Sequence, residues 1–221
     1  MRESSNIKLL PEKKKIRLFD VGSGDCRHLN ALSDSKNFTC SGIEINPALV
    51  RRGCEMGFQI YGGTLESMDI ADHRDKYDLI TMYHVLEHVQ DPVIVMHKAY
   101  SMLREGGYVV GQLPSVDSVE HKWFGSSWAG YHFPRHTFVY SRSGLCELFG
   151  RSGFEVIKIR SAPHCQTAIS LQNVIQKTGF KMRLLSGRSF LYPFLLFLSL
   201  MFEGLTTIFD RGGTVDFVIR K

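Results

Sequence analysis

A glycine-rich turn next to an acidic residue carries the most distinctive chemistry in this sequence. The segment 16–29 reads IRLFDVGSGDCRHL, in which an apolar run ends at Asp20 and turns at Gly22 and Gly24 before a helical pattern resumes. A strand that leads through a glycine turn into a helix brings backbone N–H groups and a carboxylate to one point. A second acid, Glu44, ends the next apolar run. In open α/β sheets, ligands bind at this edge, outside the carboxyl ends of the strands.

The charges around the turn distinguish between ligand classes. The dinucleotide fingerprint G-x-G-x-x-G needs a third glycine where this sequence has Arg27, and Asp20 would oppose a pyrophosphate. A ligand with a cationic end fits better. S-adenosylmethionine carries a sulfonium and an ammonium, and Glu44 can accept hydrogen bonds from both of its ribose hydroxyls. Two alternatives stay open: a nicotinamide-dinucleotide oxidoreductase, which Arg27 and Asp20 disfavour, and a turn that only joins a strand to a helix.

Composition describes an ordinary globular chain with a mildly basic charge. The 221 residues are 43% hydrophobic and 22% charged, with a formal net charge of +5. The lysine run 13–15 is typical of a solvated terminus, so we expect no nucleic-acid partner. The five cysteines include no C-x-x-C pair, and their odd number means that they cannot all form disulfides within the chain. This fits reduced thiols in a cytoplasmic protein.

Strand patterns alternate with helical patterns along most of the chain, which predicts βαβ units and a mostly parallel sheet. The predicted strands are 16–20, 39–45, 57–61, 77–82, 108–113, 154–160 and 214–220. We expect a helix over 91–103, ended by the glycine pair at 106–107. One domain, 1–221, would hold a short N-terminal segment (1–15), an active-site loop rich in aromatic and histidine residues (117–140) and a helical insertion (164–209).

Several motifs give the chain a family resemblance. They are FDVGSGDCRHL (19–29), GIEINP (42–47), GTLES (63–67), YDLITMYHVLEHVQDP (77–92), LREGGYVVGQLPS (103–115), WAGYHFPRHTFVYS (128–141) and GFEVIKI (153–159). With them the chain resembles class I S-adenosylmethionine-dependent methyltransferases. It is most similar to the ubiquinone-biosynthesis O-methyltransferase branch and its relatives in bacterial polysaccharide gene clusters. The resemblance implies a Rossmann-like three-layer α/β sandwich, whose seven-stranded sheet has the order 3-2-1-4-5-7-6 with strand 7 (214–220) antiparallel.

The resemblance also implies a cofactor site, with S-adenosylmethionine as cofactor and S-adenosylhomocysteine as product. Carried over by motif, Asp20, Gly22 and Gly24 line the methionine end and Glu44 holds the ribose. Leu65 and Glu66 flank the adenine, while Tyr83 and His84 close the pocket. The expected reaction is O-methylation of a small-molecule, glycan or lipid-linked acceptor, and a catalytically silent binding or assembly protein of the same fold is the alternative. Few residues precede the first strand, so we expect a short or missing N-terminal cover over the cofactor.

The segment His84–His88 (HVLEH) matches the H-x-x-E-H pattern of inverted zincins. That chemistry needs two histidines one turn apart on a helix of sufficient length. Here the motif directly follows a predicted buried strand, and Asp91 and Pro92 start a new element soon after it. We therefore predict no metal site at these residues.

Two histidines in the loop 117–140 are the candidates for acid–base chemistry. Methyl transfer to a hydroxyl is helped by a general base, and histidine titrates near neutrality. We predict His136 as the base or acceptor-orienting residue, with His132 second and Arg135 beside them for an acidic substrate group. Packing within the loop is the alternative role for both histidines. The aromatic residues of the same loop, among them Trp123, Trp128 and Tyr131, are expected to form a small core rather than to stack on a ligand.

The stretch 189–209 (SFLYPFLLFLSLMFEGLTTIF) is apolar on all sides but is interrupted by Pro193, Glu203 and Gly204. A charge at the centre of a membrane span is costly. A span would also separate the strand 214–220 from its sheet. The remaining interpretations are a helical hairpin packed on the domain, a homodimer interface, and a helix lying on a membrane surface. The last of these would make the cytoplasmic protein membrane-associated.

Overall fold

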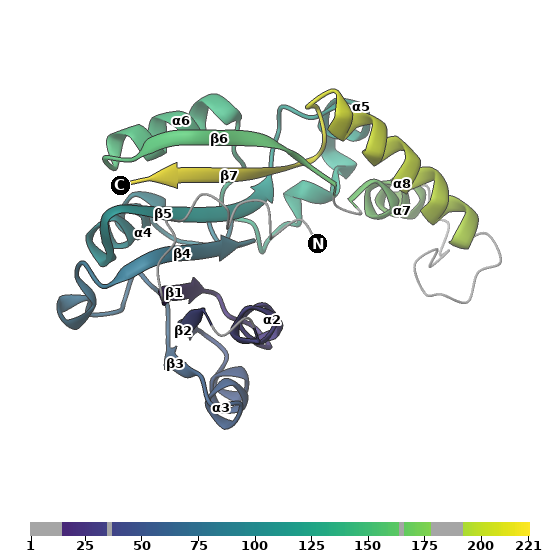
Figure 1. Cartoon of the computed structure of the whole chain (residues 1–221). Coiled ribbons are helices and arrows are strands. Elements are labelled where there is room, and N and C mark those ends of the chain that lie inside the picture. The colour runs from purple at the N-terminus through teal and green to yellow at the C-terminus, as the bar shows by residue number, and fades with distance from the viewer. Residues whose placement is uncertain (1–14, 35–36, 164–165, 178–191) are drawn as a thin grey trace. The chain divides into compact units, whose positions relative to one another are not determined.

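The structure is a computed structural model that describes residues 15–34, 37–163, 166–177 and 192–221. Within these residues, seven strands form one sheet in the order β3-β2-β1-β4-β5-β7-β6 (Figure 1). Strand β7 runs antiparallel to the other strands of the sheet. The predicted Rossmann-like α/β fold with an antiparallel last strand is therefore confirmed.

Each predicted strand is present. The strands are β1 (Ile16–Val21), β2 (Phe38–Glu44), β3 (Gln59–Gly62), β4 (Tyr77–Tyr83), β5 (Leu103–Pro114), β6 (Glu155–Ala162) and β7 (Thr214–Arg220). Parallel pairing of β1 with β2 and β4 sets Asp20 opposite Gly42 on one side and Thr81 on the other. Pairing of β2 with β3 sets Glu44 opposite Gly62. The ends of these strands are thus brought to one edge.

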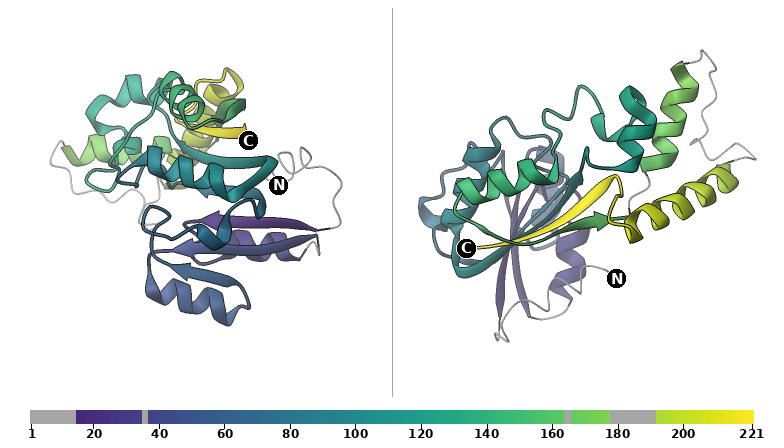
Figure 2. Two further views of the ribbon diagram at one scale, coloured as in Figure 1. Left: turned by 90° about the vertical axis from the view of Figure 1, so that its left-hand side faces the viewer. Right: turned by 90° about the horizontal axis from the view of Figure 1, so that it is seen from above.

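Local capping signals mark the starts of α3 (Pro47–Glu55) and α4 (Pro92–Met102) among the helices of the described chain. The helices are α2 (Arg27–Ser33), α3 (Pro47–Glu55), α4 (Pro92–Met102), α5 (Val119–Phe124), α6 (Arg142–Arg151), α7 (Gln166–Lys177) and α8 (Tyr192–Ile208). The Asn46 side chain caps α3, and Asp91 Oδ1 accepts hydrogen bonds from the first amides of α4; in both helices proline is the first residue. Helix α3 packs on β3 and β2, and α2 packs on β2 (Figure 2).

The helix before β5 ends at Met102, within one residue of the expected end, but the expected start of the next strand was wrong. Strand β5 begins at Leu103 instead of at residue 108. The glycine pair lies inside β5, where Gly106 N donates to Lys221 O at 3.2 Å and Lys221 N donates to Gly107 O at 3.0 Å. These bonds to the distant end of the chain stabilise the extended conformation, so the glycines do not cap the helix.

The described chain divides into two compact units. Unit 1 comprises residues 1–111, 146–158 and 217–221, and unit 2 comprises residues 112–145 and 159–216. The core of unit 1 gathers buried side chains from β1, α2, β3, β4, β5 and β7, among them Leu18, Leu29, Ile60, Leu79 and Val218. The assignment of the whole chain to a single domain stays a prediction.

Unit 2 contains the aromatic loop and the helical insertion. Trp128 is 1% exposed and lies edge-on to His121 and Tyr131, with ring centroids 5.2 and 5.4 Å away. Trp128 and Tyr131 therefore belong to a small core, as expected, whereas Trp123 is 71% exposed. The insertion contains α7 and α8; its residues 164–165 and 178–191, like residues 1–14 of the N-terminal segment, lie outside the described residues. In the described part of the chain, no helix is long and apolar enough to cross a membrane.

Candidate functional site

The glycine turn after β1 is tied to the end of β2 by backbone hydrogen bonds. Gly22 N and Ser23 N both donate to Ile43 O, at 2.9 and 3.1 Å. Gly22 has a φ of +74°, a conformation that side chains with a Cβ rarely adopt, and a Cβ there would lie 3.0 Å from Val85 Cγ2. The turn therefore depends on glycine for both its conformation and its close approach to the loop after β4.

Glu44 connects this turn to the start of α3. Its Oε2 accepts a hydrogen bond from Gly24 N at 2.8 Å, and its Oε1 accepts one from Asn46 N at 2.9 Å. The side chain is largely buried, and the two amides fix the orientation of the carboxylate. Because each carboxylate oxygen can accept more than one hydrogen bond, the group keeps capacity for two hydroxyl donors.

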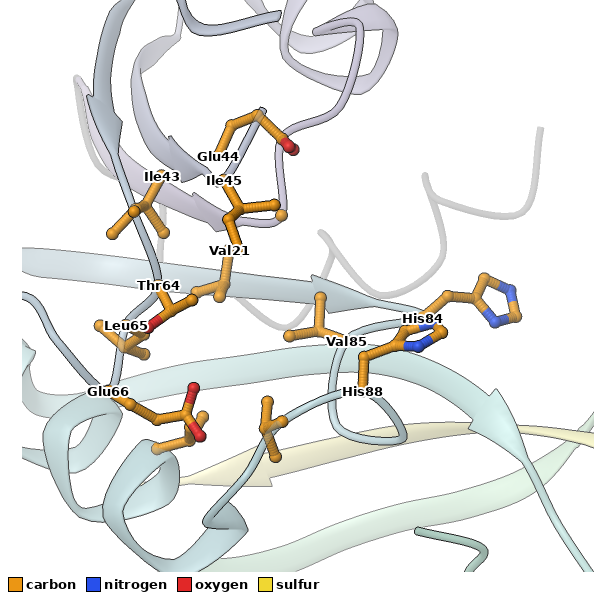
Figure 3. Close-up of a pocket in the computed structure, with 14 residues that line it drawn as sticks. Val21, Ile43, Glu44, Ile45, Thr64, Leu65, Glu66, His84, Val85 and His88 are labelled. Atoms are coloured by element: carbon orange, nitrogen blue, oxygen red, sulfur yellow. The ribbon is translucent and has the colours of Figure 1, made fainter. Parts of the chain in front are cut away.

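A cavity of about 340 Å³ opens beside Glu44, at the carboxyl ends of the strands of unit 1 (Figure 3). This volume lies within the range of small-molecule sites. Its walls are mostly apolar, with two carboxylates and two histidines among them. They come from the ends of β1 and β2, from the loops after β3 and β4, and from the first turn of α4: Val21, Gly22, Ile43, Glu44, Ile45, Gly63, Thr64, Leu65, Glu66, His84, Val85, His88, Val89 and Val95.

Five of the eight predicted cofactor residues line this cavity: Gly22, Glu44, Leu65, Glu66 and His84. The sequence reasoning did not name Ile45, which is 70% exposed and directly follows Glu44. Its position after the acid that ends β2 was the available signal. An apolar side chain beside the carboxylate provides a wall for a flat ring next to a group that binds hydroxyls.

The other three predicted residues lie near the cavity without lining it. Gly24 contributes through its N–H bond to Glu44. Asp20 is buried at the end of β1, where its Oδ1 accepts a hydrogen bond from Thr81 Oγ1 at 2.6 Å. Tyr83, at the end of β4, packs against the unit 1 core and lies edge-on to His28, with the ring centroids 5.1 Å apart.

Glu66 has a structural role in addition to its place in the cavity wall. Its Oε1 accepts hydrogen bonds from Gln90 N at 2.6 Å and Asp91 N at 2.9 Å. These bonds join the loop after β3 to the segment that starts α4. The loop that carries Leu65 is held in place by them, and Leu65 itself is only 2% exposed.

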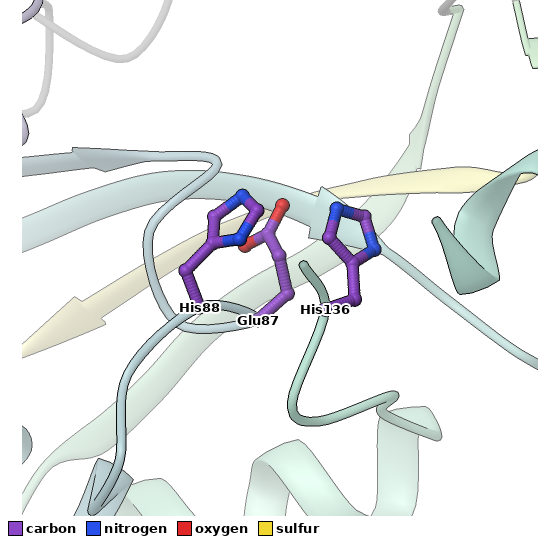
Figure 4. A group of neighbouring side chains, drawn as sticks. All are labelled: Glu87, His88 and His136. Carbon is purple, nitrogen blue, oxygen red and sulfur yellow. The ribbon is translucent and has the colours of Figure 1, made fainter. Parts of the chain in front are cut away.

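The segment His84–His88 is a turn and not a helix. His84 has a φ of +55°, and its Nδ1 lies 3.1 Å from Oε1 of the buried Glu87. His88 N donates to Val85 O at 2.9 Å and closes the turn, on which Glu87 and His88 follow one another (Figure 4). The two histidines do not stand one turn apart on a helix, so the geometry of an inverted zincin is not present in this segment.

The predicted catalytic histidines belong to unit 2. His136 Nδ1 lies 2.6 Å from Gly130 O, and the rings of His132 and His136 meet edge-on with centroids 5.1 Å apart. A carbonyl partner places the proton on Nδ1 and makes Nε2 of His136 an acceptor. His136 also lines a cavity of about 500 Å³ within unit 2, together with Tyr131 and Phe133. The catalytic roles of His132 and His136 stay predictions.

The residues of the unit 1 cavity fit S-adenosylmethionine. Glu44 offers a fixed carboxylate for two hydroxyls, and Ile45 and Leu65 offer apolar walls. The buried carboxylate of Asp20, at the end of β1, would attract the cationic end of such a ligand. We find no positively charged lysine or arginine side chain among the lining residues, which disfavours a pyrophosphate.

Comparisons with solved structures show the same fold. An S-adenosylmethionine-dependent methyltransferase from Archaeoglobus fulgidus is similar with a TM-score of 0.63 and 19% identity, over 100% of this chain and 91% of that one. A second, from Mesorhizobium loti, has a TM-score of 0.63 and 16% identity, over 99% and 96% of the chains. A mycolic acid cyclopropane synthase solved with S-adenosylhomocysteine has a TM-score of 0.65 and 15% identity, over 100% and 83% of the chains.

The family follows from the sequence itself. The sequence model of a family described as "Methyltransferase domain" matches residues 4–159, which include every predicted cofactor residue. The predicted cofactor, S-adenosylmethionine, agrees with this family and with the similar structures, one of which is an S-adenosylmethionine-dependent methyltransferase and another a complex with S-adenosylhomocysteine. Because the match covers well over half of the 221 residues, the chain belongs to this methyltransferase family.

Proposed function

We propose that the protein transfers a methyl group from S-adenosylmethionine to an oxygen atom of a small-molecule, glycan or lipid-linked acceptor. The observation that carries the proposal is the Glu44 carboxylate, held by two backbone amides beside the unit 1 cavity in a chain of the methyltransferase family. The choice of oxygen rests on the resemblance of the motifs to ubiquinone-biosynthesis O-methyltransferases and to relatives in polysaccharide gene clusters.

In this proposal Glu44, Ile45 and Leu65 bind the nucleoside part of the cofactor. Glu44 accepts hydrogen bonds from the two ribose hydroxyls, and the amides of Gly24 and Asn46 hold it in place before the cofactor arrives. A carboxylate that is already oriented loses little entropy on binding, so its hydrogen bonds contribute more fully to affinity. Ile45 and Leu65 pack against the adenine.

Asp20 and the glycine turn bind the methionine part. S-adenosylmethionine, when bound, supplies a methyl group activated by its positively charged sulfonium. The buried Asp20 carboxylate attracts this cationic end, and Thr81 holds the carboxylate in one orientation. Gly22 keeps the turn free of a side chain that would occupy the cavity.

His136 is the residue we propose to hold the proton released by the acceptor hydroxyl, at its Nε2 atom. The Gly130 carbonyl sets the tautomer that this role requires. His132 is the second candidate, because its ring contacts the ring of His136. Methyl transfer from the sulfonium is a displacement by the acceptor oxygen. Beyond the contribution of a general base, most of its rate enhancement comes from positioning the acceptor and excluding water.

The cofactor site is tested by isothermal titration calorimetry with S-adenosylmethionine, S-adenosylhomocysteine and NAD. Hydrogen bonds to a charged group contribute about 1.5–3 kcal/mol, so Glu44→Gln should weaken binding of both S-adenosyl compounds about 10- to 100-fold. The matched control is Glu55→Gln, which removes an exposed carboxylate from α3 and should leave affinity unchanged. Equal affinity of Glu44→Gln and wild type, or comparable affinity for NAD, would contradict the proposal.

The proposed role of His136 in methyl transfer is tested by measuring turnover with candidate hydroxyl acceptors. His136→Asn should lower turnover about 100-fold while the affinity for S-adenosylmethionine stays near the wild-type value. His97→Asn, which changes an exposed histidine on α4, is the control and should retain wild-type turnover. If His136→Asn turns over as fast as wild type, His136 has no role in the reaction. A complete lack of methyl transfer to every acceptor class, despite tight cofactor binding, would favour a silent binding protein.

A further inference from the structure

Helix α8 is polar on the side that packs on its own unit and apolar on the side that faces away. Its buried polar residues, Ser199, Glu203 and Thr206, follow a spacing of four and three residues and are 4%, 3% and 6% exposed. The opposite side carries an apolar stripe, each member of which is 47–78% exposed: Phe194, Phe197, Leu198, Met201, Leu205 and Ile208. A helix on the surface of a protein in water normally has the reverse arrangement.

The buried polar side of α8 has partners within unit 2. Glu203 Oε1 accepts a hydrogen bond from Thr167 N at 2.6 Å, and Thr206 Oγ1 donates to Glu120 Oε1 at 3.1 Å. Burial raises the pKa of Glu203 and so favours its neutral form. Hydrogen bonds within unit 2 thus explain the burial of the polar side, whereas among the described residues the members of the apolar stripe stay largely exposed.

The apolar stripe extends along the helix and is joined by an exposed tryptophan. Six large side chains at helical spacing make a continuous surface, and Trp123 of α5 stacks on Phe202 beside it, with ring centroids 4.9 Å apart. Contiguous exposed patches of this kind mark interaction sites, because each exposed apolar side chain costs free energy in water. The described helices include none that could cross a membrane, so α8 would have to lie along whatever surface it contacts.

We infer that the apolar stripe of α8 docks on a lipid bilayer that contains anionic headgroups. The stripe contains no hydrogen-bond donor, and its one acceptor is the weak thioether sulfur of Met201, which suits an acyl layer that offers no hydrogen-bonding partner. Unit 2 has nine lysines and arginines against five aspartates and glutamates, and two of those acids, Glu120 and Glu203, are buried. The excess positive charge of the unit matches anionic headgroups. The inference does not depend on the identity of the methyl acceptor.

The chain carries its own reporter for this contact. It has two tryptophans, of which Trp123 is 71% exposed and Trp128 is 1% exposed. Vesicles of phosphatidylcholine and phosphatidylglycerol should shift the emission of Trp123 to shorter wavelength, and brominated acyl chains should quench it. Trp123→Phe should abolish most of the change in emission while leaving co-sedimentation with the vesicles in place. Emission unaffected by such vesicles would overturn the inference.

Co-sedimentation with vesicles distinguishes binding through the apolar stripe from nonspecific binding of the protein. Replacing two exposed apolar side chains of the stripe by glutamine, in Phe197→Gln/Met201→Gln, should lower vesicle partitioning at least tenfold. Met56→Gln, which changes a 41% exposed methionine at the end of α3 in unit 1, is the control and should partition like wild type. Partitioning should also fall with added salt and on pure phosphatidylcholine.

Two results would refute the lipid assignment. One is wild-type partitioning of Phe197→Gln/Met201→Gln, because the stripe would then not be the contact. The other is a dimer in analytical ultracentrifugation that dissociates in this variant, together with no vesicle binding by wild type, which would assign the stripe to a second copy of the chain.

Discussion

Thr81 holds the buried carboxylate at the end of β1, and removing its hydroxyl should destabilise the protein. Thr81 Oγ1 donates to Asp20 Oδ1 at 2.6 Å, and the two residues are 2% and 4% exposed. Thr81→Val keeps the shape of the side chain and removes the donor. Because a hydrogen bond to a charged group contributes about 1.5–3 kcal/mol, we expect the free energy of unfolding to fall by that amount.

The neighbourhood of Asp20 offers little compensation for this loss. His28 Nδ1 lies 3.8 Å from the same carboxylate oxygen, which is beyond hydrogen-bond distance. The strand register places Thr81 directly opposite Asp20, so no small movement of the side chain supplies another donor from β4. The penalty should therefore appear in full in the unfolding free energy.

Urea unfolding followed by circular dichroism measures this change, and a double-mutant cycle isolates the hydrogen bond. Asp20→Asn replaces the charged acceptor with a neutral one, whose hydrogen bond contributes about 0.5–1.5 kcal/mol. Thr81→Val should therefore cost about 1 kcal/mol less in the Asp20→Asn background than in wild type. A Thr81→Val protein within about 0.5 kcal/mol of wild type, or an equal penalty in both backgrounds, would refute the reasoning.

Three further predictions concern Gly42 of β2, which lies opposite Asp20, and two carboxylates of unit 2. Gly42→Ala should lower both the unfolding free energy, by about 1–3 kcal/mol, and cofactor affinity in calorimetry, because its Cβ would lie 2.6 Å from Asp20 O. Hydrogen bonds from Arg142 lower the pKa of Asp210, so Asp210→Asn should cost stability at neutral pH. That cost should shrink as the pH falls below the ordinary value of 3.8, in urea unfolding at several pH values. Burial raises the pKa of Glu203, so the native state binds its proton more tightly than the unfolded chain and loses stability as the pH rises above 4.5. Glu203→Gln should therefore be more stable than wild type at pH 7 but not at pH 4 in thermal unfolding, and the opposite order would contradict this assignment.

Local signals in the sequence predicted much of the fold. Asp91, followed by proline, caps the helix that was expected from residue 91, and Asn46, also followed by proline, caps α3 in the same way, because capping needs only the residues next to the helix end. The glycine turn and the acid after the second strand were likewise recognisable, and Glu44 lines the cavity. Alternating strand and helix patterns predicted a mostly parallel sheet, and the family resemblance implied the seven-stranded order that the structure has.

Other features depended on residues far apart in the chain. Strand β5 begins at Leu103 instead of at residue 108 because hydrogen bonds between Gly106, Gly107 and Lys221 keep this segment extended. No pattern near residue 103 contains that information. The proposed role of His136 likewise depends on where the acceptor hydroxyl lies, which is set by distant parts of the chain and not by the residues next to His136.

The sequence alone determined the family, the order of elements and the residue types around the cofactor cavity, since these rest on short-range conformational preferences and on motifs. Only the tertiary structure showed that Thr81 holds Asp20, that Gly24 and Asn46 orient Glu44, and that α8 turns its polar side inward. An apolar stretch such as 189–209 has no preferred side until its neighbours are known. Partners such as Thr167 and Glu120, distant in sequence, supply the hydrogen bonds that make one side of α8 the buried one.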